Sequence, residues 1–275
     1  RSTPLYSSAA SDVYKRQGRY VVYLKNTFPR DLTLEGMRVV LDCANGAAYK
    51  VGPTVLRELG ANLTTLGIEP NGRNINQDCG SLHPEAVAEL VRKQHAHIGL
   101  AVDGDSDRVM IVDEKGEVLD GDEVIALCAR YLSEEGRLTG GGVVTTVMSN
   151  LGLEDALKSR GLELIRANVG DRYVGEAMRE GGYNLGGEQS GHGIFLDYGT
   201  TGDGLMTALQ VLAILAREGV SLSTLVSDFK RYPQSLVNIA VQKKQPLESL
   251  PGLQAALSEV EAKLGDQGRV LIRYS

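Results

Sequence analysis

From Gly36 onward, short runs rich in β-branched residues alternate with segments whose apolar residues recur at helical spacing. Strands separated by helices run parallel, because each helix returns the chain to the same edge of the sheet. The pattern therefore predicts an α/β fold with mixed, mostly parallel sheets covered by helices. In such sheets ligands bind at the carboxyl ends of the strands, so the loops at those ends are the first candidates for function.

The alternation occurs twice and predicts two domains in tandem. For the first domain we expect strands at 37–43, 62–68, 98–103, 109–112 and 117–119, and helices at 51–59, 84–95 and 120–135. We expect Asp120 to cap the last of these helices, with Glu123 as its capping-box partner. For the second we expect strands at 143–148, 162–169 and on both sides of 186–192, and helices at 151–160, 172–180, 202–217 and 222–230. A glycine run at 140–142 marks the boundary and gives domains at 18–138 and 139–246.

The two ends of the chain differ from this pattern. Residues 1–17 show no convincing periodicity, and we expect them to be an extraneous or disordered leader. At 247–275 the sequence predicts a linker, a helix at 253–264 and a strand at 269–274. One helix and one strand cannot enclose a core, so we expect the start of a further domain that is cut short.

Composition narrows the classes of partner. The net charge of −6 and a pI near 5.4 argue against general binding to nucleic acid or to a membrane surface, which needs a basic field. No apolar run reaches membrane-spanning length, and we expect a cytoplasmic protein with a small-molecule ligand. Three widely spaced cysteines indicate reduced thiols, and Cys43 and Cys128 fall in apolar segments that predict core packing.

Three aspartates at alternating positions follow the predicted strand at 98–103: Asp103, Asp105 and Asp107. Alternate residues of extended backbone point to one side, and converging carboxylates repel unless a cation joins them. Mg²⁺ takes such oxygen ligands. An EF-hand calcium loop is disfavoured, because Arg108 occupies the position that needs glycine and 109–112 is predicted as strand. A solvated acidic turn remains an alternative.

A second loop, 186–192, places an acid, an amide, a hydroxyl and an imidazole between glycines. Glu188 can accept hydrogen bonds from sugar hydroxyls, Ser190 can donate or accept, and a protonated His192 can meet a phosphate. An ordinary hairpin turn is the alternative interpretation. Arg172 opens a predicted helix beside Asp171, where a phosphate contact and a simple exposed side chain are about equally favoured.

The segment Asp103-Gly-Asp-Ser-Asp-Arg108, followed by Gly187-Glu-Gln-Ser-Gly-His192, resembles the α-D-phosphohexomutase superfamily. Further segments at 41–46, 74–81, 146–152 and 169–174 are similar to its bacterial amino-sugar branch, and the resemblance extends over 18–275. It implies that the three aspartates hold one Mg²⁺ and that the catalytic Arg108 lies beside the transferring phosphoryl group. It also implies that Glu188 and Ser190 bind sugar hydroxyls, and that Arg273 and Ser275 begin a phosphate-clamping loop.

The implied reaction interconverts glucosamine 6-phosphate and glucosamine 1-phosphate, on the route to amino-sugar nucleotides and cell-wall precursors. A phosphoserine and a glucosamine 1,6-bisphosphate intermediate carry the phosphoryl group in this family. The resemblance places that serine in a first domain which this sequence does not match, so we expect a monomeric or homodimeric enzyme when full length and no activity from this chain alone. Two alternatives stay open: a mutase for neutral hexose phosphates, and a non-catalytic module that binds metal or sugar phosphate.

Overall fold

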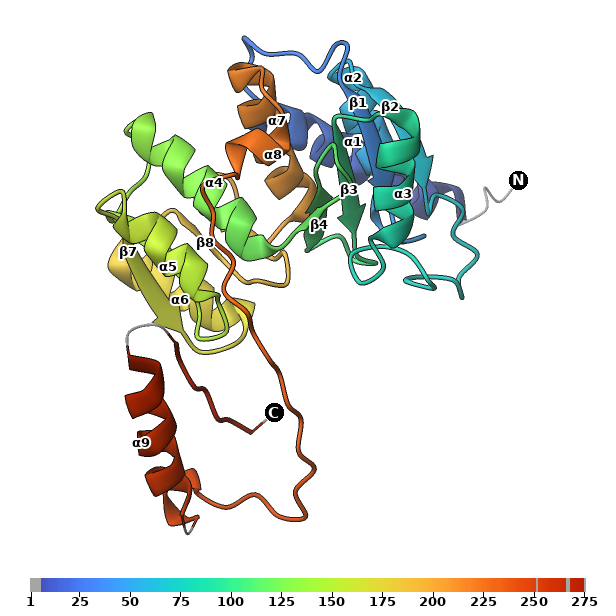
Figure 1. Ribbon diagram of the computed structural model, residues 1–275. Coiled ribbons are helices and arrows are strands. Elements are labelled where there is room, and N and C mark those ends of the chain that lie inside the picture. Colours follow the sequence, from blue (N-terminus) through green and yellow to red (C-terminus); the bar gives the residue numbers. More distant parts are fainter. Residues whose placement is uncertain (1–5, 251, 266–267, 275) are drawn as a thin grey trace. The chain divides into compact units, whose positions relative to one another are not determined.

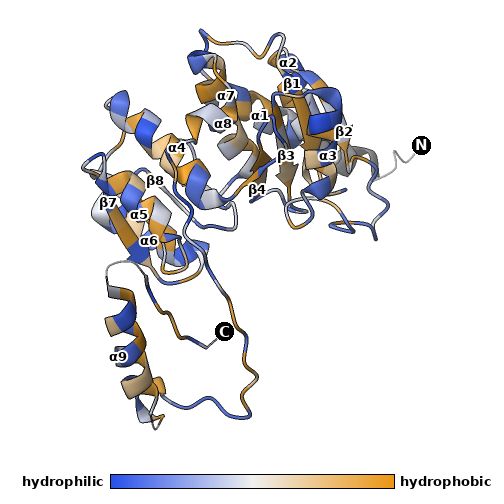
Figure 2. Cartoon of the chain, in the orientation of Figure 1, coloured by the Kyte–Doolittle hydropathy of each residue, from blue (hydrophilic) through white to orange (hydrophobic). Residues whose placement is uncertain are grey.

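The computed structural model describes residues 6–250, 252–265 and 268–274 (Figure 1). The chain divides into two compact units, one up to Lys230 and one from Arg231 onward. No described helix is long and apolar enough to span a membrane. Figure 2 shows hydrophobic residues concentrated in the strands and in α7 (Gly204–Glu218), whereas the connecting loops are mostly hydrophilic.

The first sheet has five strands in the order β2-β1-β3-β4-β5. These are β1 (Arg38–Asp42), β2 (Asn62–Leu66), β3 (Ile98–Val102), β4 (Val109–Val112) and β5 (Val118–Leu119). β1 pairs in parallel with β2 and β3, whereas β4 turns back antiparallel to β3 and β5 to β4. Val40 and Ala101 face α3 (Glu85–Gln94), and the alternate residues face the larger core that contains α2 (Ala48–Glu58).

The second sheet repeats this arrangement on a smaller scale, in the order β7-β6-β8-β9. Its strands are β6 (Gly142–Thr146), β7 (Glu163–Ala167), β8 (Leu185–Gly187) and β9 (Gly193–Phe195). β6 is parallel to β7 and β8, and β8 and β9 form an antiparallel hairpin. The helices that follow β6 and β7 are α5 (Leu151–Lys158) and α6 (Asp171–Gly181). The predicted α/β class with mixed sheets is therefore confirmed.

Two helices join the sheets. α4 (Gly121–Glu134) begins at the predicted capping box: the Asp120 carboxylate accepts hydrogen bonds from the amides of Asp122 and Glu123, and the Glu123 carboxylate accepts one from the Asp120 amide at 3.1 Å. α4 contacts α5 and β8 of the second sheet more extensively than β4 and β5. Our predicted boundary after residue 138 gave this helix to the first domain, but its packing associates it mainly with the second. α7 contacts both sheets, and α8 (Leu222–Leu225) follows it.

The expectation that the leader is disordered is wrong for residues 6–17, because one helix, α1, runs from Tyr6 to Thr27. That the leader is extraneous stays a prediction. Residues 1–5 lie outside the described part of the chain. α1 contacts α2 and α7, and Leu24 near its end is fully buried. The hydrophobic anchor of this helix lies C-terminal to residue 17, so the first seventeen residues by themselves carry little of its signal.

In the second unit, α9 (Leu253–Leu264) has the predicted bounds and follows a short 3₁₀ turn, Leu247–Ser249. The predicted strand at 269–274 is not formed among the described residues, where 268–274 have no regular structure. A β-strand needs a hydrogen-bonded neighbour, and the described residues beyond Lys230 contain no other strand. One contact that orders this segment is the Tyr274 hydroxyl, which donates to the Gln245 carbonyl at 2.8 Å.

Candidate functional site

The three aspartates occupy the turn between β3 and β4. One carboxylate oxygen from each of Asp103, Asp105 and Asp107 lies within 4.8 Å of the others, as the alternation in the sequence predicted. The turn is tight: the Ser106 amide donates to the Asp103 carbonyl at 3.1 Å, and the Arg108 amide donates to the Asp103 carboxylate at 3.2 Å. The fold therefore gathers three acidic groups at the carboxyl end of a buried parallel strand.

The electrostatics of this turn fit a cation. Burial, together with the carboxylates of Asp107 and Asp105, raises the pKa of Asp103 to about 6. Asp107 Oδ1 is buried and has no hydrogen-bond partner among the described residues. The only lysine or arginine side chain paired with the turn in the described structure is Arg108, whose Nε lies 3.9 Å from Asp103 Oδ2 and 3.7 Å from Asp107 Oδ1. An orphaned carboxylate oxygen among hard oxygen donors suits a divalent metal ion.

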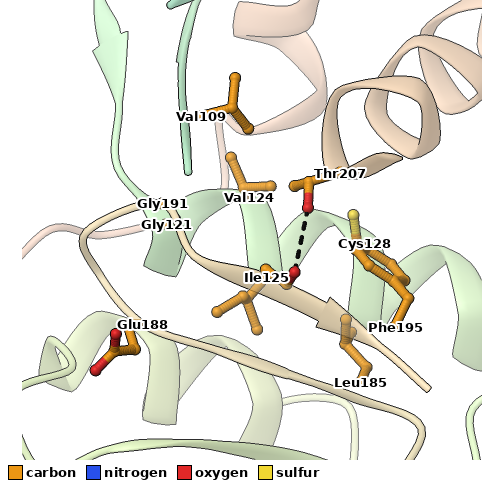
Figure 3. A pocket seen from close by; sticks show the side chains of 11 residues that line it. Val109, Gly121, Val124, Ile125, Cys128, Leu185, Glu188, Gly191, Phe195 and Thr207 are labelled. Atoms are coloured by element: carbon orange, nitrogen blue, oxygen red, sulfur yellow. Dashed lines mark hydrogen bonds between the residues drawn. The ribbon is translucent and has the colours of Figure 1, made fainter. Parts of the chain in front are cut away.

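The second loop is the turn of the β8–β9 hairpin. The Glu188 carboxylate is half-buried and accepts a hydrogen bond from the Gly170 amide at 3.1 Å, at the start of α6. Ser190 at the tip is exposed. Figure 3 shows apolar side chains, among them Ile125, Leu185 and Phe195, gathered around a small cavity behind the hairpin, with the Glu188 carboxylate apart from them. The hairpin strands thus pack over a small, mainly apolar cavity.

The two loops are in direct contact. The Val109 amide, at the start of β4, donates to the Gly191 carbonyl at 3.1 Å. His192 Nδ1 lies 3.2 Å from Asp107 Oδ2, and its Nε2 lies 3.9 Å from Asp171 Oδ2. The imidazole is only 2% exposed. His192 therefore contacts Asp107 directly, whereas its buried Nε2 has no hydrogen-bond partner among the described residues. Its predicted contact with a phosphate stays a prediction.

A third element supports the hairpin loop, and sequence reasoning missed it. The Gly121 amide at the start of α4 donates to the Gln189 carbonyl at 2.9 Å, and the Gln189 amide side chain donates to Asp120 Oδ2 at 3.2 Å. The sequence predicts Asp120 only as a helix cap. A capping box is a local signal, and nothing in the sequence indicated that the second carboxylate oxygen would contact a loop far along the chain.

Three candidate residues for phosphate binding remain. The Arg172 side chain is 81% exposed on α6 and forms an ion pair with Glu176 at 2.9 Å. Arg273 belongs to the second unit, and Ser275 lies outside the described residues. Their predicted roles in phosphate binding therefore stay predictions.

Family models match almost the whole chain. The alpha/beta/alpha domain II of the phosphoglucomutase/phosphomannomutase family matches residues 18–116, domain III matches 120–232, and the C-terminal domain matches 236–275. The chain belongs to the phosphohexomutase family. In its domain division α4 belongs to domain III, in agreement with the packing of that helix.

Individual phosphohexomutases give the same result. A phosphoglucosamine mutase of Syntrophotalea carbinolica is 55% identical over 258 residues, which cover 94% of this chain and 56% of the relative. One from Nitratidesulfovibrio vulgaris (strain DSM 19637 / Miyazaki F) is 56% identical over 266 residues, or 97% of this chain and 59% of the relative. The chain thus spans little more than half the length of these curated relatives.

Solved structures share the phosphohexomutase fold. A phosphoglucomutase/phosphomannomutase family protein of Burkholderia thailandensis aligns with a TM-score of 0.68 and 28% identity, over 78% of this chain and 46% of that one. The N-acetylphosphoglucosamine mutase of Aspergillus fumigatus, solved with GlcNAc-6P and magnesium, aligns with a TM-score of 0.69 over 91% of this chain and 61% of that one. Its identity of 22% supports the fold alone.

Proposed function

We propose that this chain forms the metal-binding and sugar-binding part of a phosphoglucosamine mutase, which interconverts glucosamine 6-phosphate and glucosamine 1-phosphate. The observation that carries the proposal is the cluster of three carboxylates within 4.8 Å, placed directly against a hairpin loop rich in hydrogen-bonding groups. The relatives that are 55% and 56% identical bear the name of this enzyme.

Asp103, Asp105 and Asp107 would hold the Mg²⁺ ion, which neutralises charge on phosphoryl oxygens when it is bound. Magnesium accompanies a sugar phosphate in the structure of the Aspergillus fumigatus relative. Arg108 adds a permanent positive charge on the same turn, and its side chain remains 43% exposed, so a phosphoryl group can reach it. These residues therefore supply electrostatic stabilisation where phosphoryl groups exchange.

The hairpin loop would hold the sugar. Glu188 is oriented by the Gly170 amide and can accept from hydroxyl groups, and the exposed Ser190 can donate or accept. Hydroxyls that lie between the two phosphorylated positions can occupy similar places after the sugar reverses, so one loop serves both orientations of a glucosamine 1,6-bisphosphate intermediate. Fixing the sugar places the attacking oxygen in line with the phosphoryl group.

The metal site is tested by calorimetric titration of the 275-residue chain with Mn²⁺ and with Mg²⁺. We expect binding that disappears in the triple variant Asp103→Asn, Asp105→Asn, Asp107→Asn, because neutral amides are poor ligands for a hard cation. Indistinguishable titrations of the two proteins would contradict the metal assignment.

Substrate class is tested on the complete gene product by comparing kcat/KM for glucosamine 6-phosphate, glucose 6-phosphate and mannose 6-phosphate. The amino sugar should have the highest value. A higher value for either neutral sugar would instead assign the chain to a mutase for neutral hexose phosphates, and the metal titration would be unaffected by that result.

A further inference from the structure

The segment Gly202–Asp203–Gly204 has no role in the proposed function. It packs against the hairpin loop and against the metal loop, which is the turn that carries Asp103, Asp105 and Asp107. The Gly204 amide donates to the Ser106 carbonyl in the metal loop at 2.9 Å. A Cβ atom on Gly204 would lie 2.5 Å from the Arg108 carbonyl oxygen. On the other side, a Cβ atom on Gly202 would lie 2.1 Å from His192 Nε2. The segment is therefore packed against both loops so closely that neither glycine has room for a side chain.

The residue between these glycines is fixed from two directions. Asp203 Oδ1 accepts from the Met206 amide at 2.9 Å and caps α7. Asp203 Oδ2 accepts from the Tyr20 hydroxyl of α1 at 2.7 Å. The backbone of Asp203 is tied to the hairpin as well, since its amide donates to the Gly193 carbonyl at 3.3 Å. The position of this one carboxylate thus depends on α7 and on the N-terminal helix.

The hydrogen bond between the Tyr20 hydroxyl and Asp203 persists across the neutral pH range. Burial and the neighbouring Asp203 carboxylate raise the pKa of the Tyr20 hydroxyl, so it remains a donor throughout the neutral range. Burial also raises the pKa of Asp203, while the amide of Met206 and the hydroxyl of Tyr20 favour its ionised form. If the half-buried Asp203 carboxylate loses the Tyr20 donor, it must either bind water or rotate to another partner. Because the glycines on both sides of Asp203 pack against the two loops, such a rotation would shift the loops.

We propose that Tyr20 and Asp203 are positioning residues of the mutase site, through which helix α1 sets the arrangement of the metal loop and of His192. The inference rests on the proposed function, because it concerns the same metal and sugar loops. In this role neither residue would contact the ligand directly. They act through Gly204 on the Ser106 carbonyl and through Gly202 on the His192 ring, and His192 in turn contacts Asp107.

The test uses Tyr20→Phe in the 275-residue chain, with Tyr23→Phe as the matched control. Tyr23 lies on the same helix. Its hydroxyl donates to the Tyr198 carbonyl and approaches Met206 Sδ at 3.9 Å, so the control removes hydroxyl contacts of α1 other than the one with Asp203. We expect Tyr20→Phe to weaken Mn²⁺ binding by about 3- to 10-fold, a part of the full effect of a lost charged hydrogen bond. The control should stay within about twofold of wild type. Circular dichroism at the titration temperature establishes that each variant is folded.

Two further variants separate positioning from general stability. Asp203→Asn keeps an oxygen for the Met206 amide and can pair with Tyr20 in the reverse sense, so it should retain most of the Mn²⁺ affinity. Asp203→Ala should lose as much affinity as Tyr20→Phe or more, and adding Tyr20→Phe to it should have little further effect. Additive losses would overturn the coupling.

The outcomes also distinguish this inference from the proposed function. If wild type binds Mn²⁺ and Tyr20→Phe binds equally well, the positioning role is wrong and the metal site stands. If wild type does not bind Mn²⁺, the metal assignment fails and the inference fails with it. Equal losses in Tyr20→Phe and Tyr23→Phe would show a general effect of α1 stability and would also overturn the positioning role.

Discussion

Ser106 sits at the tip of the metal loop with a φ of +66°, in the left-handed region where a Cβ atom is unfavourable. Its hydroxyl is buried without a hydrogen-bond partner among the described residues. Ser106→Gly should therefore raise the free energy of unfolding by about 0.5–1 kcal/mol, because glycine adopts this conformation without strain. Urea denaturation measures the change.

Ser106→Ala is the matched control, since it removes the hydroxyl but keeps the Cβ atom. The alanine variant should gain less free energy of unfolding than the glycine variant if the backbone conformation is the main source of strain. An alanine variant as stable as the glycine variant would show that the buried hydroxyl is responsible instead. Mn²⁺ affinity should remain within about twofold of wild type in both, because the three carboxylates are unchanged.

Asp122 is fully buried at the start of α4, where its Oδ2 accepts from the Asn150 amide at 2.7 Å. Burial raises its pKa to about 6. Because the folded pKa lies above the unfolded value near 3.9, the folded state binds more protons between about pH 4 and 6, and this group lowers stability as pH rises through that range. Asp122→Asn should therefore raise the free energy of unfolding at pH 7.5 by about 1–3 kcal/mol.

The advantage of Asp122→Asn should shrink to nearly zero at about pH 4, where the native carboxyl is already protonated. Unfolding measured at pH 4 and pH 7.5 gives the comparison. A stabilisation by Asp122→Asn that is equal at both pH values would contradict the titration argument.

At the scale of elements, the Glu188 side chain of the β8–β9 hairpin loop should act on sugar binding and not on metal binding. Glu188→Ala is expected to weaken the binding of glucosamine 6-phosphate to the complete protein by about one to two decades, as for loss of a charged hydrogen bond. Mn²⁺ affinity should stay nearly unchanged, because the carboxylates belong to a different turn. Glu188→Gln keeps an acceptor for the Gly170 amide. If this variant loses less sugar affinity than Glu188→Ala, the difference measures how much the Gly170 hydrogen bond supports the loop.

Regular elements with strong local signals were predictable from the sequence. The β-branched run at Val109–Val112 and the helix Leu253–Leu264 have the predicted bounds, and the capping box at Asp120 is formed. Elements that depend on distant partners were not predictable. The N-terminal part of α1 is stabilised as the extension of a helix anchored by Leu24, and the segment at 269–274 is not a strand because it lacks a neighbour.

The same distinction applies to the site. Alternation along extended backbone was enough to predict that Asp103, Asp105 and Asp107 converge. The contact between His192 and Asp107, and the support of the hairpin loop by Asp120, join segments far apart in sequence. Such contacts follow from the packing of α4 and α7 between the two sheets. Local sequence patterns do not predict this packing.

At the scale of the whole molecule, we expect no mutase turnover from the 275-residue chain alone. The mechanism implied by the family needs a phosphoserine, and we assign that role to no residue here. Ser106 is buried in the metal loop with no base bonded to its hydroxyl among the described side chains. A coupled assay with glucosamine 6-phosphate, Mg²⁺ and glucosamine 1,6-bisphosphate should give only background. Turnover that Ser106→Ala abolishes would overturn this assignment of roles.

Each sheet ends its parallel run with a strand that doubles back, and each of the two loops closes such a pair. Val102 is in register with Val109 across the metal loop, and Gly187 with Gly193 across the hairpin loop. Both ends of each loop are therefore anchored by sheet hydrogen bonds, and most of the conformational entropy of these loops is lost when the protein folds. A ligand then has little loop disorder left to remove, so more of its interaction energy remains available for affinity.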